Sequence, residues 1–228
     1  MKHIVFLSGA GMSAESGIST FRDSNGLWEQ YDVMDVASIE GWRRNPHLML
    51  KFYNERRAQL NEVEPNEGHR IIAALEKDFK VSVITQNVDN LHERAGSSHV
   101  VHLHGELTKA CNESKTQVYE IGVKPIHPGD KAEDGSQLRP FIVWFGEAVP
   151  LIEKAAKIIS TADIVVIIGT SMQVYPAAGL IHYAPKNIPV FLIDPNPISP
   201  VMSNIRIIRE KAVAGMKILE KKLKSAEL

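Results

Sequence analysis

The sequence contains a single cysteine, Cys111, among 228 residues. A disulfide within the chain is therefore impossible, and so is a zinc site made of four cysteines. Acidic and basic side chains nearly balance at a formal net charge of −1, which does not favour nucleic acid as a partner. The sequence has no apolar run as long as a membrane span and no signal-peptide pattern. We expect a cytoplasmic monomer that binds neither nucleic acid nor membranes.

Hydrophobic residues make up 44% of the chain and charged residues 23%, as in a globular protein with a sizeable core. Strand-like segments alternate with helix-like segments, which predicts an α/β fold with a doubly wound, parallel, Rossmann-like sheet. Strands are expected at 4–8, 81–85, 100–103, 141–147, 163–168, 189–193 and 205–208. Helices are expected at 47–60, 67–79, 151–160, 176–183 and 213–224.

Two insertions interrupt this alternation. Residues 29–65 contain the first expected helix, whereas residues 112–139 lose apolar periodicity and are rich in glycine, proline and charge. In the second stretch we expect at most a short hairpin around 118–121. We therefore predict that two insertions form a smaller domain beside the Rossmann-like one. The larger domain would comprise 1–28, 66–106 and 146–228, and the smaller one 29–65 and 107–145.

The spacing Gly9-x-Gly11-x-x-Ala14 follows the first apolar run. In a strand–turn–helix unit, Gly9 allows a tight turn, Gly11 leaves room for a phosphate, and Ala14 lets the helix pack against the strand. A dehydrogenase would continue into a second strand ending in Asp or Glu about twenty residues later. Residues 28–33 show no strand pattern. The loop therefore predicts a dinucleotide that is bound for a reaction other than hydride transfer.

Polar residues follow several of the expected strands. Loops are usually polar, but in parallel sheets ligands bind at the carboxyl ends of the strands. Because several strand ends carry such residues, we favour a single crevice at this edge. The residues are Gln86, Asn87, Asp89, His104, Gly169, Thr170, Ser171, Asp194 and Asn196.

His102 and His104 would share one face of a strand, because side chains alternate along it. Such a pair can hold a metal ion, so a metallohydrolase is one alternative. It would need further ligands, and the sequence offers no convincing ones. Another alternative is that one of these histidines is structural.

Several ordered motifs resemble those of the sirtuins, the NAD-dependent protein deacylases. Residues 9–22 read Gly-Ala-Gly-x-Ser-x-x-Ser-Gly-Ile-x-x-Phe-Arg and resemble the first signature of the family. Residues 85–92 resemble its nicotinamide and ribose motif, and residues 102–105 its catalytic histidine motif. Residues 143–147 resemble the strip that pairs with the acyl-lysine peptide. The resemblance covers nearly the whole chain except the second insertion.

This resemblance implies catalytic roles for four residues. The acyl oxygen of a modified lysine would attack the ribose of NAD, and His104 would then act as general base on a ribose hydroxyl. Asn87 and Asp89 would hold the nicotinamide carboxamide, and Gln86 would orient the ribose. The products would be free lysine, nicotinamide and O-acyl-ADP-ribose.

The resemblance also implies which residues contact the two substrates. Phe21 would shield the reactive sugar and Arg22 would steady the loop. Those expected to contact NAD are Gly9, Ala10, Gly11, Ser13, Ala14, Phe21, Arg22, Trp28, Gln86, Asn87, Val88, Asp89, Gly169, Thr170, Ser171, Asp194, Pro195, Asn196 and Ala212. Those expected at the acyl-lysine are Ala37, Tyr53, Arg56, Val143, Phe145, Gly146 and Glu147.

Tyr53 and Arg56 are spaced i, i+3 on an expected helix, so they lie on one face. For an arbitrary pair, a solvated helix face would be the favoured interpretation. Here the segment resembles class III sirtuins, in which Arg56 would clasp an acyl carboxylate and Tyr53 would add a hydrogen bond. Ala37 matches the small residue that widens their acyl pocket. We predict desuccinylation and demalonylation with some deacetylation.

Most sirtuins fold their small domain around zinc held by four cysteines, and this chain has only Cys111. We therefore predict a zinc-free small domain and no metal site. A different function is a non-catalytic module that binds NAD or ADP-ribose. The presence of His104, Asn87 and Asp89 speaks against it, because a pure binder needs no base.

Overall fold

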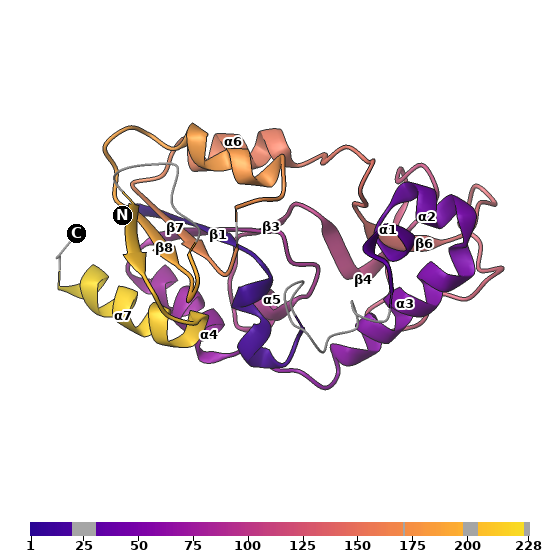
Figure 1. The fold of residues 1–228 in the computed structure, drawn as a ribbon, viewed down its shortest axis with the longest axis horizontal. Coiled ribbons are helices and arrows are strands. Elements are labelled where there is room, and N and C mark those ends of the chain that lie inside the picture. Colours follow the sequence, from indigo (N-terminus) through magenta and orange to yellow (C-terminus); the bar gives the residue numbers. More distant parts are fainter. Residues whose placement is uncertain (20–30, 171, 198–204, 226–228) are drawn as a thin grey trace.

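The computed structural model describes residues 1–19, 31–170, 172–197 and 205–225 (Figure 1). Its larger sheet has six parallel strands in the order β3-β2-β1-β7-β8-β9, which confirms the predicted doubly wound α/β fold. The strands are β1 (His3–Ser8), β2 (Lys80–Thr85), β3 (Val100–His102), β7 (Ile164–Ile168), β8 (Val190–Ile193) and β9 (Ile205–Ile208).

Helices cover both faces of this sheet, as the apolar composition of its strands requires. In β1, Ile4 and Phe6 pack with the helices on one face, and Val5 and Leu7 pack on the other. The first face carries α4 (Glu67–Ala74) and α7 (Ala212–Lys224), and the second carries α6 (Ile152–Ile159) and the 3-10 helix η5 (Ala177–Tyr183). None of the described helices is long and apolar enough to cross a bilayer.

The strand order reverses beside β1, and this places a crevice at the carboxyl ends of β1 and β7. Ser8 at the end of β1 pairs in register with Thr85 of β2 and with Ile168 of β7. The loops that start at Gly9 and Gly169 therefore leave the sheet at the same level.

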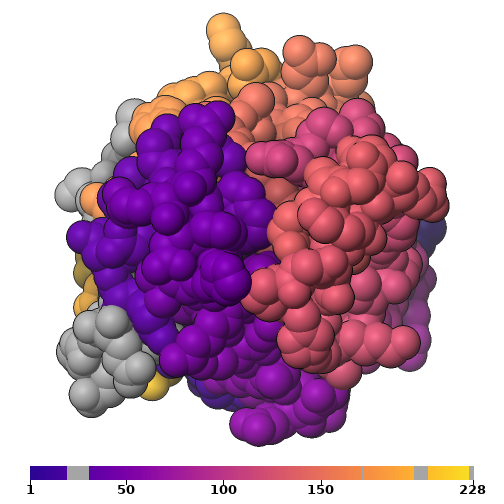
Figure 2. Space-filling view, turned by 90° about the vertical axis from the view of Figure 1, so that its right-hand side faces the viewer, coloured from indigo at the N-terminus to yellow at the C-terminus, as the bar shows by residue number. Residues whose placement is uncertain are grey.

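The second sheet is antiparallel and has the order β5-β4-β6. Its strands are β4 (Gly105–Cys111), β5 (Val118–Glu120) and β6 (Arg139–Ile142). Three helices pack on it through a core of aromatic and aliphatic side chains: α1 (Val33–Val36), α2 (Ile39–Arg44) and α3 (Pro46–Gln59). Figure 2 shows these segments, from both predicted insertions, side by side at one end of the molecule. The domain boundaries themselves stay a prediction.

Local signals set where the helices begin. The side chain of Asn45 accepts a hydrogen bond at the start of α3, and Pro46 occupies the first position, where its missing N–H costs nothing. Asn66 and His69 form a capping box at the start of α4. The Asn66 amide also donates to the carbonyl of Met12 at 2.8 Å, and so ties α4 to the loop after β1.

The structure corrects the expected helix after the glycine loop. Instead, the chain forms two short 3-10 helices, η1 (Ala10–Met12) and η2 (Ala14–Ser16), which end at Gly17 with a φ of 94°. The reason is tertiary: Gly11 N–H donates to the Gly169 carbonyl at 2.9 Å, and this bond holds the turn against the β7 loop.

Other boundaries also differ from the predictions. The strand expected at 141–147 lies at 139–142, because β6 pairs with β4, a strand that the sequence analysis missed. The helix expected at 176–183 is the 3-10 helix η5. The helix expected at 67–79 leaves α geometry at residue 74 and continues as η4 (Leu75–Lys77). A short helix, α5 (Leu91–Arg94), follows β2 and was not expected.

Asn112 joins the loops of the small sheet. Its side-chain nitrogen lies 3.0 Å from Thr116 Oγ1 and 2.7 Å from Asp134 Oδ2, and its side-chain oxygen accepts from Gln117 N–H at 3.0 Å. The other oxygen of Asp134 accepts from Ser136 N–H and Oγ. Asn112 is 1% exposed whereas Asp134 is exposed, so these bonds run from a buried amide to the surface and form a staple between residues 112–117 and 134–136.

The donor set of this region does not fit a zinc ion. Burial raises the pKa of the Cys111 thiol to about 11, which disfavours the thiolate that binds metals. Among the described residues, no three His, Cys, Asp or Glu side chains are grouped as metal ligands. A zinc-free small domain stays a prediction that metal analysis can test.

The staple predicts the effect of Asn112→Ala. This change removes the buried amide that bonds to Asp134 and to the Gln117 N–H. Asp134 is exposed and can bond to water instead, so the free energy of unfolding should fall by only about 1 kcal/mol. Thermal denaturation measures the loss, and Asn61→Ala, at an exposed asparagine, is the matched control. Chelator should leave the wild-type melting temperature unchanged. A chelator effect as large as that of Asn112→Ala would show that a metal holds these loops.

Candidate functional site

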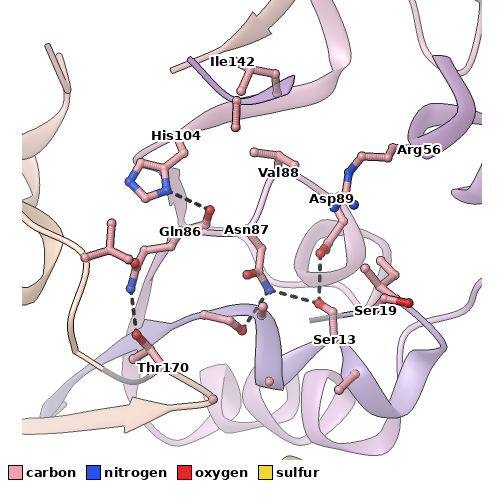
Figure 3. Close-up of a pocket in the computed structure, with 18 of the residues that line it drawn as sticks. Ser13, Ser19, Arg56, Gln86, Asn87, Val88, Asp89, His104, Ile142 and Thr170 are labelled. Carbon is pink, nitrogen blue, oxygen red and sulfur yellow. Dashed lines mark hydrogen bonds between the residues drawn. The ribbon is translucent and has the colours of Figure 1, made fainter. Parts of the chain in front are cut away.

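A cavity of about 1010 Å³ lies between the carboxyl edge of the parallel sheet and the small sheet with its helices. Figure 3 shows part of its lining, which comes from both regions of the chain. Every described residue that the sequence analysis assigned to NAD, to the acyl-lysine or to catalysis lines this cavity. Phe21, Arg22, Trp28 and Ser171 lie outside the described residues. The predicted crevice at the ends of the strands is therefore present.

Backbone contact between two loops forms the floor of the cavity. A Cβ atom on Gly11 would lie 2.7 Å from Gly169 Cα, and one on Gly9 would lie 2.7 Å from Thr170 Cβ. Gly169 itself has a φ of 62°, which favours glycine. From the sequence, glycine at position 11 was expected to leave room for a phosphate, whereas the structure shows that the contact with Gly169 already requires a glycine there. The floor offers backbone in place of bulky side chains, which suits the close approach of a pyrophosphate.

A directed chain of hydrogen bonds orders the segment after β2. The Asn87 amide donates to the Gly9 carbonyl and to Ser13 Oγ, both at 3.1 Å. Ser13 Oγ in turn donates to Asp89 Oδ2 at 2.9 Å, and Leu91 N–H donates to Oδ1 at 3.1 Å. Burial raises the pKa of Asp89, and these two donors oppose that shift. The chain holds Asn87 and Asp89 in one arrangement at the cavity wall (Figure 3).

Gln86 follows β2 and contacts residues that follow two other strands, β3 and β7. Its amide donates to Thr170 Oγ1 at 3.1 Å, and its carbonyl lies 3.1 Å from His104 Nδ1. Because a carbonyl only accepts, Nδ1 carries the proton and Nε2 of the neutral ring is left as a base. Burial lowers the pKa of His104, against the bond to Gln86, which raises it. The His104 carbonyl accepts from Val143 N–H at 2.9 Å. His104 is therefore built to accept a proton at neutral pH.

His102, two residues before His104, has a structural role. Its Nδ1 lies 2.9 Å from the Asn87 carbonyl and its Nε2 lies 2.7 Å from Glu93 Oε1. Burial lowers the pKa of His102, but these two acceptors outweigh it and the net shift is upward. His102 and His104 thus bind the carbonyls of two consecutive residues, Asn87 and Gln86. With both nitrogens of His102 engaged, the pair does not form a metal site.

Tyr53 and Arg56 of α3 line the same cavity, as does Ala37. Tyr53 is 4% exposed and Arg56 is half-buried, so the interpretation as a solvated helix face is wrong. Burial raises the pKa of Tyr53 to about 12 and lowers that of Arg56, whose charge Tyr53 and Asp89 support. The Arg56 guanidinium also lies 5.5 Å from the centre of the Phe52 ring. A phenol and a guanidinium in a partly desolvated cavity suit a carboxylate ligand.

The 143–147 strip is anchored more firmly than a free peptide-binding edge. Phe145 N–H donates to the Ala37 carbonyl at 2.8 Å, and the Phe145 carbonyl accepts from Ile39 N–H at 3.0 Å. Gly146 is exposed, and its backbone groups bond to no described residue. The backbone of Gly146 is therefore open to a ligand, whereas that of Phe145 is already used.

The carboxylate of Glu147 is also committed. It accepts from Trp144 N–H at 2.8 Å, from Lys115 Nζ at 2.6 Å and from both terminal nitrogens of Arg139. These bonds explain why the pKa of Glu147 is lowered although burial raises it. Glu147 shapes the turn at the cavity wall and leaves little capacity for a further partner.

A further set of residues lines the cavity without having been predicted from the sequence. Val174 and Tyr175 are 38% and 73% exposed and line the cavity together with Phe145, which is 45% exposed. An apolar Val-Tyr-Pro run after the Gly169–Ser171 strand end was the available signal, but only its proline was assigned, to the start of the helix expected at 176–183. Glu15 was also missed: it lines the cavity and accepts from Val213 N–H at 2.8 Å, near the start of α7.

Comparisons with known proteins agree with this geometry. The family model "Sir2 family" matches residues 9–176. An NAD-dependent protein deacylase of Bacteroides thetaiotaomicron is 58% identical over 235 aligned positions, which cover 98% of each chain. A protein of the same description from Helicobacter pylori is 53% identical over 224 positions, again with 98% of each chain covered.

Solved structures give the same result. A Sir2 homologue in complex with ADP-ribose has a TM-score of 0.88 and 36% identity, with 99% of this chain and 93% of that chain covered. A Sir2 homologue in complex with NAD has a TM-score of 0.87 and 36% identity, with 99% and 90% covered. Because the family model spans well over half of the chain and the relatives span nearly all of it, the chain belongs to the Sir2 family.

Proposed function

We propose that the protein is an NAD-dependent protein-lysine deacylase that prefers succinyl and malonyl groups and also removes acetyl groups. The observation that carries the preference is that Tyr53 and Arg56 line the same cavity as His104. The relatives described as NAD-dependent protein deacylases support the general activity, and the Sir2 homologues bound to NAD and ADP-ribose support the cosubstrate.

NAD would bind along the carboxyl edge of the parallel sheet. The Gly9–Gly11 turn and Gly169 would receive its pyrophosphate, and the segment from Asp194 to Asn196 would receive its adenosine end. Asn87 and Asp89 would receive the nicotinamide carboxamide, whose N–H groups can donate to the side-chain oxygen of Asn87 and to the Asp89 carboxylate. When bound, NAD supplies a nicotinamide leaving group and a ribose that accepts the acyl group.

His104 would take a proton from a ribose hydroxyl at Nε2. The Gln86 carbonyl fixes the tautomer that leaves this nitrogen unprotonated. Gln86 is itself held through its side chain by Thr170, so the base and the ribose-orienting group share one support. This coupling keeps His104 at a set position relative to the cavity floor.

The modified lysine would enter between Gly146 and the exposed Val174–Tyr175 segment. The peptide backbone would bond to the open groups of Gly146, and apolar side chains on both rims would cover the lysine stem. At the inner end Arg56 would clasp the carboxylate of a succinyl or malonyl group, and Tyr53 would add a third hydrogen bond.

Matched peptides with acetyl-, succinyl- and malonyl-lysine test this proposal directly. Nicotinamide release should require NAD and should be faster for the dicarboxylic acyl groups. Arg56→Met should lower the succinyl-to-acetyl ratio of kcat/KM, because loss of the charged partner of a buried carboxylate costs about 2–5 kcal/mol. Lys51→Met, at an exposed lysine of the same helix, is the control and should keep the ratio.

The outcomes distinguish the alternatives. An Arg56→Met ratio equal to that of the wild type would count against the acyl preference while keeping the deacylase. Measurable NAD binding without nicotinamide release from any acyl peptide would instead favour a non-catalytic binding module.

The pH dependence of kcat/KM tests the role of His104. Burial lowers the pKa of this histidine below its ordinary value of about 6.5, so the neutral base should persist at pH 6.5. Activity should therefore fall only as the pH drops below about 6.5. If activity instead fell with a midpoint above that pH, the result would contradict this role. His104→Ala should lose both the activity and this acidic fall in kcat/KM, which would support the role.

A further inference from the structure

Trp144 contacts Tyr53 and lines the same cavity, but it was not among the residues expected to act on a substrate. Its indole Nε1 donates a hydrogen bond to the Tyr53 hydroxyl oxygen at 2.9 Å. The two ring centres are 6.0 Å apart, and both side chains are almost fully buried, at 2% and 4% exposed. The indole comes from the strip after β6, whereas the phenol comes from α3. The bond therefore links two segments that are far apart in the sequence.

The indole is held on several sides. The Arg139 guanidinium lies 3.6 Å from the centre of the Trp144 ring, and the Trp42 ring centre lies 5.3 Å away. The backbone N–H of Trp144 donates to Glu147 Oε2, and Arg139 bonds to the same carboxylate. An indole with this environment has little freedom to turn, so the direction of its N–H bond is set.

This contact decides how the Tyr53 hydroxyl can bond. An indole N–H only donates, so the phenol oxygen accepts from it and the phenol proton points elsewhere. Within the described part of the chain, that proton has no acceptor. Burial raises the pKa of Tyr53 to about 12, so the proton stays on the oxygen at working pH. Because Tyr53 lines the cavity with Arg56, the free proton suits an acceptor ligand there.

We infer that Trp144 is a specificity-determining positioning residue, whose indole N–H fixes the Tyr53 hydroxyl as a donor to the carboxylate of a dicarboxylic acyl group. This inference rests on the proposed function, because it needs an acyl carboxylate in the cavity. An acetyl group has no carboxylate to receive this proton. The indole N–H should therefore increase kcat/KM for succinyl and malonyl substrates more than for acetyl substrates.

The test is a double-mutant cycle of Trp144→Phe and Tyr53→Phe, with Tyr183→Phe, at an exposed tyrosine away from the cavity, as the control. Trp144→Phe keeps an aromatic ring and removes the N–H donor. It should lower the succinyl-to-acetyl ratio of kcat/KM roughly 3- to 15-fold, mainly through KM, as expected for one buried hydrogen bond. In the Tyr53→Phe background the same change should leave the ratio unaltered, because the hydroxyl is gone.

Tyr183→Phe removes the hydroxyl of an exposed tyrosine that does not line the cavity, and it should leave the ratio at the wild-type value. A ratio that Trp144→Phe does not lower, or that it lowers equally in the Tyr53→Phe background, would overturn the inference. A wild-type enzyme without preference for succinyl over acetyl would overturn the proposed function instead. Failure of the inference would therefore appear in the Trp144→Phe variants, whereas failure of the proposed function would appear in the wild-type enzyme.

A spectroscopic measurement tests the contact without turnover. The chain has three tryptophans, so a nitrogen-15 spectrum of the indole groups is simple, and Trp144→Phe identifies the signal of Trp144. Tyr53→Phe should move this signal towards the position of an unbonded indole. A succinyl-lysine peptide should shift it more than an acetyl-lysine peptide. Equal shifts with both peptides would show that the indole does not sense the carboxylate.

Discussion

The backbone contact between the turn after β1 and the loop after β7 is the constraint on which the site depends. Gly11 donates to the Gly169 carbonyl, and neither position has space for a Cβ atom. Two central strands of a parallel sheet therefore end in a shared floor that consists of backbone. Gln86 reaches across to Thr170 and Asn87 reaches back to Gly9, so the segment after β2 is aligned on the same floor. Without this close approach the polar residues of three strand ends would not meet.

The polar groups above the floor are connected by hydrogen bonds, and the donor and acceptor of each bond follow from the chemical groups involved. Carbonyls only accept, so Gln86 fixes the tautomer of His104, and the Asn87 carbonyl binds His102. Ser13 Oγ accepts a hydrogen bond from the Asn87 amide and donates its own to Asp89. Burial strengthens such bonds and also moves the pKa of His104 downward and that of Asp89 upward. The same low-dielectric environment thus holds the groups in place and adjusts their protonation.

The small sheet and its helices provide the opposite wall of the cavity. Here ion pairs and stacked aromatic rings hold the segments together, as the backbone contact at the glycines does on the floor. Arg139 stacks on Trp144 and binds Glu147, and Trp144 in turn bonds to Tyr53. A chain of contacts therefore runs from β6 to the inner end of the cavity. The loops of this sheet are tied by the amide of Asn112, which bonds to Asp134 and to the backbone N–H of Gln117.

The sequence by itself determined the parallel sheet, the position of its strand ends and the identity of the polar residues there. These features depend on local hydrophobic patterns and on short ordered motifs, which a single chain displays directly. The pairing of β4 with β6, the 3-10 turns after Gly9 and the reason for glycine at position 11 depended on partners far along the chain. Likewise, only the tertiary structure decided that Trp144 bonds to Tyr53 and that Val174 and Tyr175 line the cavity, because side-chain direction and long-range contact have no local signature.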